Sequence, residues 1–307
     1  MLIFLFNRTL QAVISLFGVT ALVFLILHLS GDPVALMVPE GATAEDMAVL
    51  RHQFGFDRPL LTQFADYLSD VLRGDLGTSY VQNTPVMDII ASRLPYTLQL
   101  AGAALAIALL VGLPIGIIAA LNRGRWLEKP AMGLVLAAQS MPTFWSGILL
   151  IMLFAVTLDW LPSSGAEQIQ SIILPAICLS GLTMATFARI TRNAVVEELG
   201  KDYVRAAYAR GQTRFAVVMR HVLRNASIPL ISVVALELAN LLAGAVIVET
   251  VFAWPGLGLL AVQAIQASDF VIVQALVLLG AAFYILMNLL ADVLYGVVDP
   301  RIKAVNS

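Results

Sequence analysis

The sequence predicts an all-α polytopic membrane protein with six transmembrane helices and with both termini in the cytoplasm. Three observations predict it. Hydrophobic residues make up 60% of the 307 residues and charged residues only 12%, whereas soluble domains carry roughly 25% charged residues. Six apolar runs have about the 20-residue length that crosses the hydrocarbon core of a bilayer. Basic residues are concentrated in a few of the segments that connect these runs.

The apolar runs define the predicted spans. They are residues 10–29, 96–121, 131–158, 172–190, 228–252 and 271–297. Helices are expected because lipid offers no partner to free backbone groups, and the runs lack the period-two alternation of β-barrel strands. The first run exceeds the roughly 7–15 apolar residues of a signal peptide, and no small-residue cleavage site follows it. We expect it to be a retained transmembrane helix.

The distribution of Lys and Arg orients the predicted bundle. Fourteen of the eighteen basic residues lie in the N-terminal segment, the second and fourth connections and the C-terminal tail. The third connection, residues 159–171, and the fifth, residues 253–270, contain none. Because cytoplasmic loops carry the excess of basic residues, both termini are expected in the cytoplasm.

The first connection, residues 30–94, is too long to be a simple loop, so we expect it to contain short helices of its own. Residues 44–53 fit one helix, and the Gly-containing segments 31–35 and 74–79 are typical of turns. This extracytoplasmic cap is either a docking surface for a soluble partner or a lid packed on the bundle.

The fifth connection contains a short apolar segment, residues 253–267, that is too short to span. We expect a re-entrant or interfacial helix, with Trp254 at the headgroup level and with Pro255 and Gly256 making the turn.

The second span contains the pattern Gly112-x-Pro114-x-Gly116. Small residues four apart let two helices approach closely, and we favour this explanation. A hinge in a moving bundle is the alternative, because proline marks a point where a helix bends.

Three acidic residues fall inside the predicted spans, where ionisable groups are costly and often functional. Glu237, Asn240 and Gly244 share one helix face and are the candidate translocation path. For Glu249 and Asp292 we favour hydrogen bonds that fix neighbouring helices, although Glu249, near the outer end of its helix, could also reach water. For Glu237 both interpretations stay open.

Motifs of enzymatic chemistry are missing. No segment matches the phosphate-binding pattern GxxxxGK[ST], and neither HExxH nor GxSxG occurs. His28, His52 and His221 lie far apart, and the single Cys178 lies in an apolar run. We therefore expect no catalytic residues, no metal site and no cofactor in this chain.

The most informative segment is cytoplasmic. Residues 189–229 hold eight of the eighteen Lys and Arg residues. The fourth helix is predicted to project from the membrane and to end at Gly200. Asp202 is a suitable N-cap for a short helix over residues 203–210, and Gly211 ends that helix because glycine adopts left-handed backbone angles cheaply.

A third cytoplasmic helix is predicted from Thr213, its cap, to about residue 225. It presents one apolar stripe, formed by Phe215, Val218, Met219 and Val222. A basic amphipathic helix resting on anionic lipid explains this helix well. The short helix before it, with its paired alanines, better fits a groove in a partner protein.

These residues carry a resemblance to a known family. The segment RAAYARG, residues 205–211, resembles the EAA signature (EAA-x3-G) of permeases of ABC importers, although Arg205 stands where that signature has Glu. RHVLRNASIP, residues 220–229, resembles the dipeptide, oligopeptide and nickel branch. Further matches to that branch cover nearly the whole chain: GDP at 31–33, FGFDRPL at 54–60, GDLGTS at 74–79, RLPYTLQL at 93–100, SMPTFW at 140–145, VETVFAWPGLG at 248–258 and VDPRI at 298–302.

The resemblance implies a fold and a set of partners. Residues 1–307 would form a single permease domain, similar to the transmembrane domain of type I ABC importers, in the inner membrane of a bacterium. Residues 191–227 would be the coupling region, whose ATPase-coupling residues are Asp202, Tyr203, Arg205, Ala206, Ala207 and Gly211. The implied partners are a second homologous permease in a heterodimer, two ABC ATPase subunits that bind ATP and Mg, an external substrate-binding protein and the lipid bilayer, with no nucleic acid.

The resemblance also implies import of a small solute by alternating access. The substrate would be a di- or oligopeptide, or alternatively nickel, a metal chelate or glutathione. A proton-coupled secondary transporter that uses the three acids within the spans is a competing hypothesis, but it would need no cytoplasmic docking helix. A membrane enzyme and a purely structural envelope subunit are further alternatives, and no motif supports either.

Overall fold

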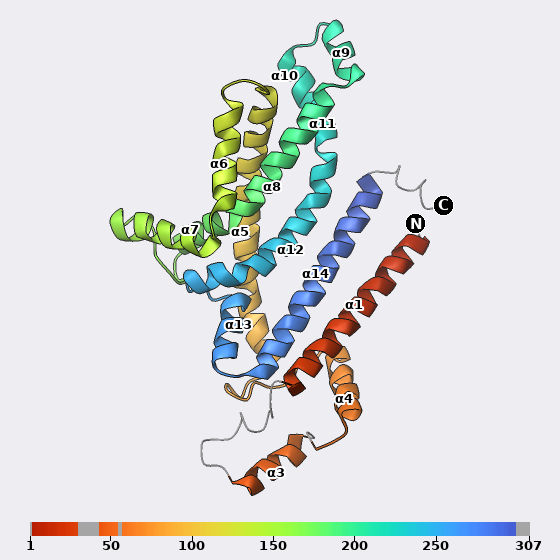
Figure 1. The fold of residues 1–307 in the computed structure, drawn as a ribbon, viewed down its shortest axis with the longest axis vertical. Helices are drawn as coiled ribbons and strands as arrows, with labels where there is room; N and C mark the ends of the chain where they lie inside the picture. The colour runs from red at the N-terminus through yellow and green to blue at the C-terminus, as the bar shows by residue number, and fades with distance from the viewer. Residues whose placement is uncertain (1, 30–42, 55–56, 299–307) are drawn as a thin grey trace. The chain divides into compact units, whose positions relative to one another are not determined.

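The computed structural model describes residues 2–29, 43–54 and 57–298, which form helices joined by turns (Figure 1). In chain order these are α1 (Leu2–Leu29), α3 (Ala44–Phe54), α4 (Leu60–Leu72), α5 (Val86–Leu121), α6 (Glu128–Ser140), α7 (Thr143–Leu150), η1 (Ile151–Thr157), η2 (Ile169–Ile172), α8 (Ile173–Leu199), α9 (Asp202–Ala209), α10 (Arg214–Val217), η3 (Val218–Val222), α11 (Leu223–Ala226), α12 (Ile228–Val251), α13 (Leu257–Gln266) and α14 (Phe270–Val298). Within the described ranges the only β pairing is an isolated bridge between Thr78 and Pro85. The all-α prediction is confirmed.

The described helices include five that are long and apolar enough to cross a membrane. They are Phe6–Ile26, Val86–Leu121, Ile169–Leu199, Pro229–Val251 and Phe270–Val293. A bent pair, Glu128–Ser140 with Thr143–Thr157, makes a sixth if its two parts cross together. Each corresponds to one of the six predicted segments.

The third predicted span, residues 131–158, is wrong as a single straight helix. Its two parts meet at an angle of 104°. Pro142 lacks an N–H and excludes the residue before it from helical angles, so Met141 is extended at φ −84° and ψ 131°. Beyond α7 the backbone widens into the π-helix η1.

The second span begins earlier than predicted. α5 starts at Val86, not at residue 96, and continues through Pro95. Its first turns are helical because Val86, Ile89 and Ile90 are buried against α13 and α14. The charged side chains between these apolar positions hide the helix from a search for long apolar runs.

The described part of the first connection includes the helices α3 and α4. α3 confirms the predicted helix over residues 44–53, whereas α4 was not predicted. α4 packs on α1 through aromatic rings, with Phe64 centred 5.8 Å from Phe17 and 5.2 Å from Phe24. Gly74 and Gly77 have φ of +81° and +83°, which confirms the turn at 74–79. The predicted turn at 31–35 lies outside the described residues.

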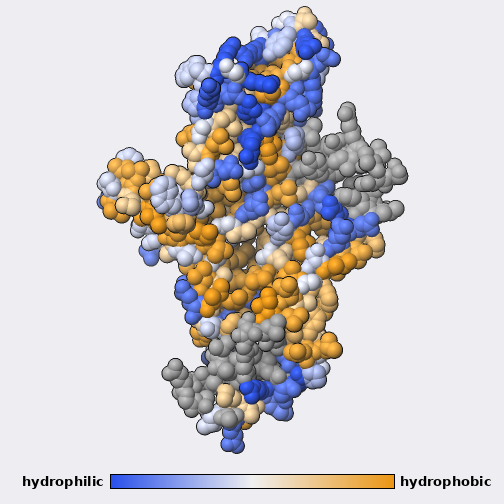
Figure 2. Space-filling view, viewed as in Figure 1, coloured by the Kyte–Doolittle hydropathy of each residue, from blue (hydrophilic) through white to orange (hydrophobic). Residues whose placement is uncertain are grey.

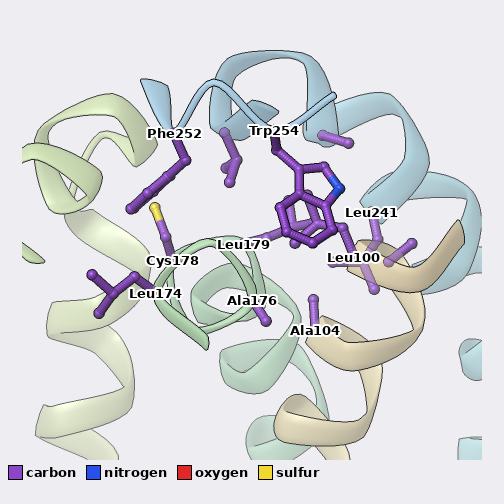
Figure 3. Packing of buried hydrophobic residues seen from close by; sticks show 12 residues of the cluster. Leu100, Ala104, Leu174, Ala176, Cys178, Leu179, Leu241, Phe252 and Trp254 are labelled. Atoms are coloured by element: carbon purple, nitrogen blue, oxygen red, sulfur yellow. The ribbon is translucent and has the colours of Figure 1, made fainter. Parts of the chain in front are cut away.

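Contacts divide the chain into two units. One contains Tyr96–Pro255 and the described residues from Met287 on, and the other contains Leu2–Pro95 and Gly256–Leu286. The core of the first unit joins α5, α8 and α12 to the segment that follows α12 (Figure 3). Its large buried side chains include Leu100, Leu174, Phe252 and Trp254.

Trp254, predicted at the headgroup level, is buried within the protein. This side chain is 3% exposed, and its Nε1 donates a hydrogen bond of 2.9 Å to the carbonyl of Tyr96 on α5. The left-handed residue of the turn is Ala253, at φ +47°, rather than Pro255 or Gly256. The chain thus folds back at once, and the indole enters the core because Tyr96 satisfies its N–H.

Glu249 is also buried and does not reach water. It is 0% exposed, and its carboxylate accepts a hydrogen bond of 2.7 Å from the Thr97 hydroxyl on α5. The backbone N–H of Trp254 bonds the carbonyl of Glu249 at 2.8 Å. The favoured interpretation, that Glu249 links neighbouring helices, is confirmed, and the link lies beside the turn that brings Trp254 inward.

The glycines of α5 allow close packing on α8. A Cβ added at Gly112 would lie 2.8 Å from the carbonyl oxygen of Met184, and one at Gly116 would lie 2.5 Å from that of Ala188. Both distances are too short for a side chain. The close-packing explanation of the Gly112-x-Pro114-x-Gly116 pattern is confirmed.

We expect Gly116→Ala to lower the free energy of unfolding by about 1–3 kcal/mol, because the new methyl group forces α5 and α8 apart. Gly102→Ala is the matched control, since it changes the same helix where a Cβ meets nothing within 4 Å. Thermal unfolding of both variants in detergent, monitored by size-exclusion chromatography, measures the difference between their melting temperatures. Equal melting temperatures would contradict close packing at Gly116.

We expect Thr97→Val to lower the free energy of unfolding by about 1–3 kcal/mol, because it removes a hydrogen bond from a buried carboxylate. Thr97→Ser keeps the hydroxyl and should unfold near the wild-type temperature. The same thermal assay compares the two, and a Val variant as stable as the Ser variant would refute the link between α5 and α12.

Candidate functional site

The candidate coupling region begins where α8 leaves the apolar zone. α8 runs without interruption to Leu199, as predicted, and α9 follows at Asp202. The predicted N-cap is wrong by one position. Lys201 has the extended angles of an N-cap (φ −77°, ψ 150°), and Asp202 is the first helical residue. Its carboxylate still lies at the positive end of the helix dipole.

The turn before α9 is held by one carboxylate of α8. Glu198 accepts hydrogen bonds of 2.5 Å from Lys201 and from the Tyr203 hydroxyl. The hydrogen bond to Glu198 raises the pKa of Lys201. The stabilisation that this bond gives to the folded protein is therefore complete at neutral pH, and it is lost only as the pH rises through the raised pKa of Lys201. Burial, followed by the same carboxylate, raises the pKa of Tyr203.

α9 has two different faces. Val204 and Ala207 are each 1% exposed and pack into a cluster formed with Ala120, Val195, Val217, Val222 and Ala226. Arg205, Ala206 and Tyr208 are exposed. The paired alanines are therefore divided: Ala207 holds the helix on its own chain, and Ala206 faces outward.

Gly211 ends α9 as predicted. Its φ is +78°, and its N–H bonds the carbonyl of Tyr208 at 2.9 Å while the N–H of Gln212 bonds Ala207 at 3.3 Å. A side chain at this φ would be strained. The turn leads directly into α10, whose predicted cap is confirmed because Thr213 accepts from the N–H of Ala216.

The predicted apolar stripe of the third cytoplasmic helix is wrong. Val218 and Val222 are buried, but Phe215 is 76% and Met219 51% exposed. The cause is the π-helix η3, which covers Val218–Val222 between α10 and α11. A π turn takes more residues than an α turn, so positions that would share one face of an α-helix diverge.

Polar contacts join this region to the neighbouring helices. The Arg214 guanidinium donates to the carbonyl of Leu121, at the end of α5, at 2.9 Å. Arg192 of α8 forms an ion pair with Glu128 of α6, whose other carboxylate oxygen accepts from the N–H of Gly124 at 2.7 Å. The ends of α5, α6, α8 and α10 are thus tied together beside α9, where hydrophilic surface gathers (Figure 2).

The candidate path residues on α12 lie in different surroundings. Glu237 is 8% exposed and accepts a hydrogen bond of 2.8 Å from Thr183 on α8. Asn240 is exposed and Gly244 is partly buried. The structure therefore groups Glu237 with α8, whereas Asn240 points out of this chain. Sequence reasoning missed Thr183, because a single Thr in an apolar helix carries no distinctive pattern.

No group of three or more His, Cys, Asp or Glu residues is arranged to hold a metal ion among the residues that the structure describes. The site offers a small exposed helix, α9, whose buried face is packed on α8 and on the segment from α10 to α11.

Comparisons with known proteins show the family of this chain. The family "Binding-protein-dependent transport system inner membrane component" matches residues 112–304, and its N-terminal companion matches residues 1–101. The glutathione transport system permease protein GsiC of Escherichia coli K12 is 42% identical over 304 residues, 99% of each chain, and GsiC of Salmonella typhi matches equally.

The fold is similar to that of solved ABC transporter structures. An inward-facing structure of the MetNI methionine ABC transporter has a TM-score of 0.58 at 21% identity, over 69% of this chain and 97% of that one. The chain therefore belongs to the family of inner membrane components of binding-protein-dependent transport systems: it is a multi-pass permease subunit of an ABC importer, without a cofactor of its own, whose ATP is hydrolysed on partner ATPase subunits.

Proposed function

We propose that this permease carries glutathione, or a small peptide of similar chemistry, into the cytoplasm. The observation that supports it is the 42% identity to glutathione permeases over 99% of both chains. Among the substrates that the sequence leaves open, this favours glutathione over unmodified di- and oligopeptides, nickel and metal chelates. The substrate first meets the external binding protein, so the permease contributes a path and a conformational cycle.

We further propose that α9 is the helix that enters the ATPase subunit. Its exposed face combines one small side chain, Ala206, with Tyr208, which is 41% exposed. Asp202 and Arg205 form an exposed ion pair on the same helix. A short helix anchored by Val204 and closed by Gly211 is a rigid projection, which suits insertion in a groove because little freedom is lost on binding.

The buried face of α9 supplies the transmission route. Val204 and Ala207 contact α8 and the α10–α11 segment within one apolar cluster. Interiors of this kind are close-packed and transmit displacement rather than absorb it. A movement of α9 driven by the ATPases would therefore move α8, and with it α12, which is joined to α8 by the bond between Thr183 and Glu237.

We propose that the translocation path runs along α12 at Glu237, Asn240 and Gly244. Asn240 supports this, because a polar amide exposed on a spanning helix is costly against lipid. The side-chain amide of Asn240 then forms hydrogen bonds with water in the path or with a second permease. We propose that this second permease is a homologous, non-identical chain.

Ala206→Trp should strongly reduce capture of the ATPase subunits while leaving the permease folded. The large side chain blocks the groove but contacts nothing in its own chain, because Ala206 is exposed. We expect recovery of the ATPase in affinity purification to fall about tenfold or more, as for the central residue of an interface.

Two controls separate docking from folding. Ala206→Ser is the conservative match and should retain the ATPase. Ala207→Trp should lower the melting temperature of the permease itself, since that position is 1% exposed. Normal ATPase recovery with Ala206→Trp would reject α9 as the docking helix.

The complex, reconstituted in proteoliposomes with its binding protein, should accumulate labelled glutathione only when ATP is present on the ATPase side. Excess unlabelled glutathione should compete, whereas nickel and an unmodified dipeptide should not. If the dipeptide or nickel competed and unlabelled glutathione did not, glutathione would be rejected as the substrate. Uptake without the ATPase subunits would contradict ATP-driven import and favour a proton-coupled carrier.

A further inference from the structure

The turn between α5 and α6 presents an unusual surface. Trp126 is 76% exposed and stands between Arg123, Arg125 and Lys129, all of them exposed. An indole surrounded by cations is not needed for the packing of this chain. The turn also lies outside α9, so the proposed coupling role does not use it.

The charge of this turn is uncompensated. Its one acidic residue, Glu128, is already occupied, because it pairs with Arg192 and accepts the N–H of Gly124. The side chains of Arg125 and Lys129 make no hydrogen bond or ion pair within the described ranges of the chain. The surface is therefore strongly positive and carries an apolar group at its centre.

The turn lies at the end of a long apolar segment. No charged residue occurs between Arg93 and Arg123, so α5 is uncharged over about the 40–45 Å that includes both headgroup regions. The side chain that follows such a segment is expected at the headgroup level, where tryptophan is enriched. The bond from Arg214 to Leu121 brings the start of α10 to the same end of α5, and Phe215 beside it is 76% exposed.

We propose that the turn at residues 122–129 binds anionic phospholipid of the cytoplasmic leaflet. Trp126 enters the boundary between headgroups and acyl chains, and Arg125 and Lys129 pair with the phosphates. Charge complementarity favours lipid as the partner, because Lys and Arg side chains close to an anionic membrane surface are attracted to it. The connection between η1 and η2 provides the contrast: Trp160 is 66% exposed, but residues 159–171 include no basic residue.

The test uses the full chain with its partner subunits, in nanodiscs of phosphatidylcholine that contain a small fraction of lipid with brominated acyl chains. Bromine quenches nearby indoles. The contribution of Trp126 is the fluorescence of the wild type minus that of Trp126→Phe, and Trp160→Phe gives the contribution of Trp160. Brominated phosphatidylglycerol is compared with brominated phosphatidylcholine at equal fractions.

We expect phosphatidylglycerol to quench Trp126 at least about twofold more than phosphatidylcholine does, and Trp160 to show no such preference. Arg125→Ser/Lys129→Ser should remove the preference. If that variant does not fold, high salt applied to the wild type should remove it instead. Absence of quenching by either lipid would mean that a protein surface covers the turn, and equal quenching would mean contact without charge recognition; both outcomes overturn the proposal.

Discussion

The close approach of α5 and α8 is the contact on which the rest of the first unit depends. Gly112 and Gly116 let the backbone of α5 lie against the carbonyls of Met184 and Ala188. In a bilayer, helices gain little from leaving lipid, so packing of this closeness supplies much of their association. Polar bonds then set the register of α8 and α5 against α12, through Thr183 with Glu237 and Thr97 with Glu249.

The same helix, α8, extends from this packed region to the turn that carries α9. Glu198 near its end holds Lys201 and Tyr203, so the orientation of α9 is set by α8 rather than by a flexible linker. This explains why α9, the proposed docking helix, can be so short. Eight residues would not form a stable helix alone, but burial of Val204 and Ala207 fixes them in place.

The fold class, the positions of the spans and the short cytoplasmic helix were predictable, because each depends on local properties: apolar length, Gly200 and Gly211. The remaining features depend on contacts distant in sequence. Trp254 and Glu249 are buried because the chain turns back onto α5. The prediction of an apolar stripe that includes Phe215 is wrong because a π-helix changes which residues share a face. The division between Ala206 and Ala207 follows from packing that no motif encodes, and the docking role of the motif itself rests on the resemblance to a family.

The polar groups of the spans also bear on specificity. Glu237 is engaged by Thr183, and Glu249 is fully enclosed. Among the described side chains of α12, the exposed polar ones are therefore Asn240 and Thr250, both uncharged. On the path that we propose along α12, such groups can hydrogen-bond a passing solute but do not select strongly among substrates of different charge, because discrimination requires buried polar groups that a wrong ligand leaves unpaired. On this proposal, selection falls to the external binding protein, and the permease needs only to open in the correct order, which is the role that we propose for α8 and α9.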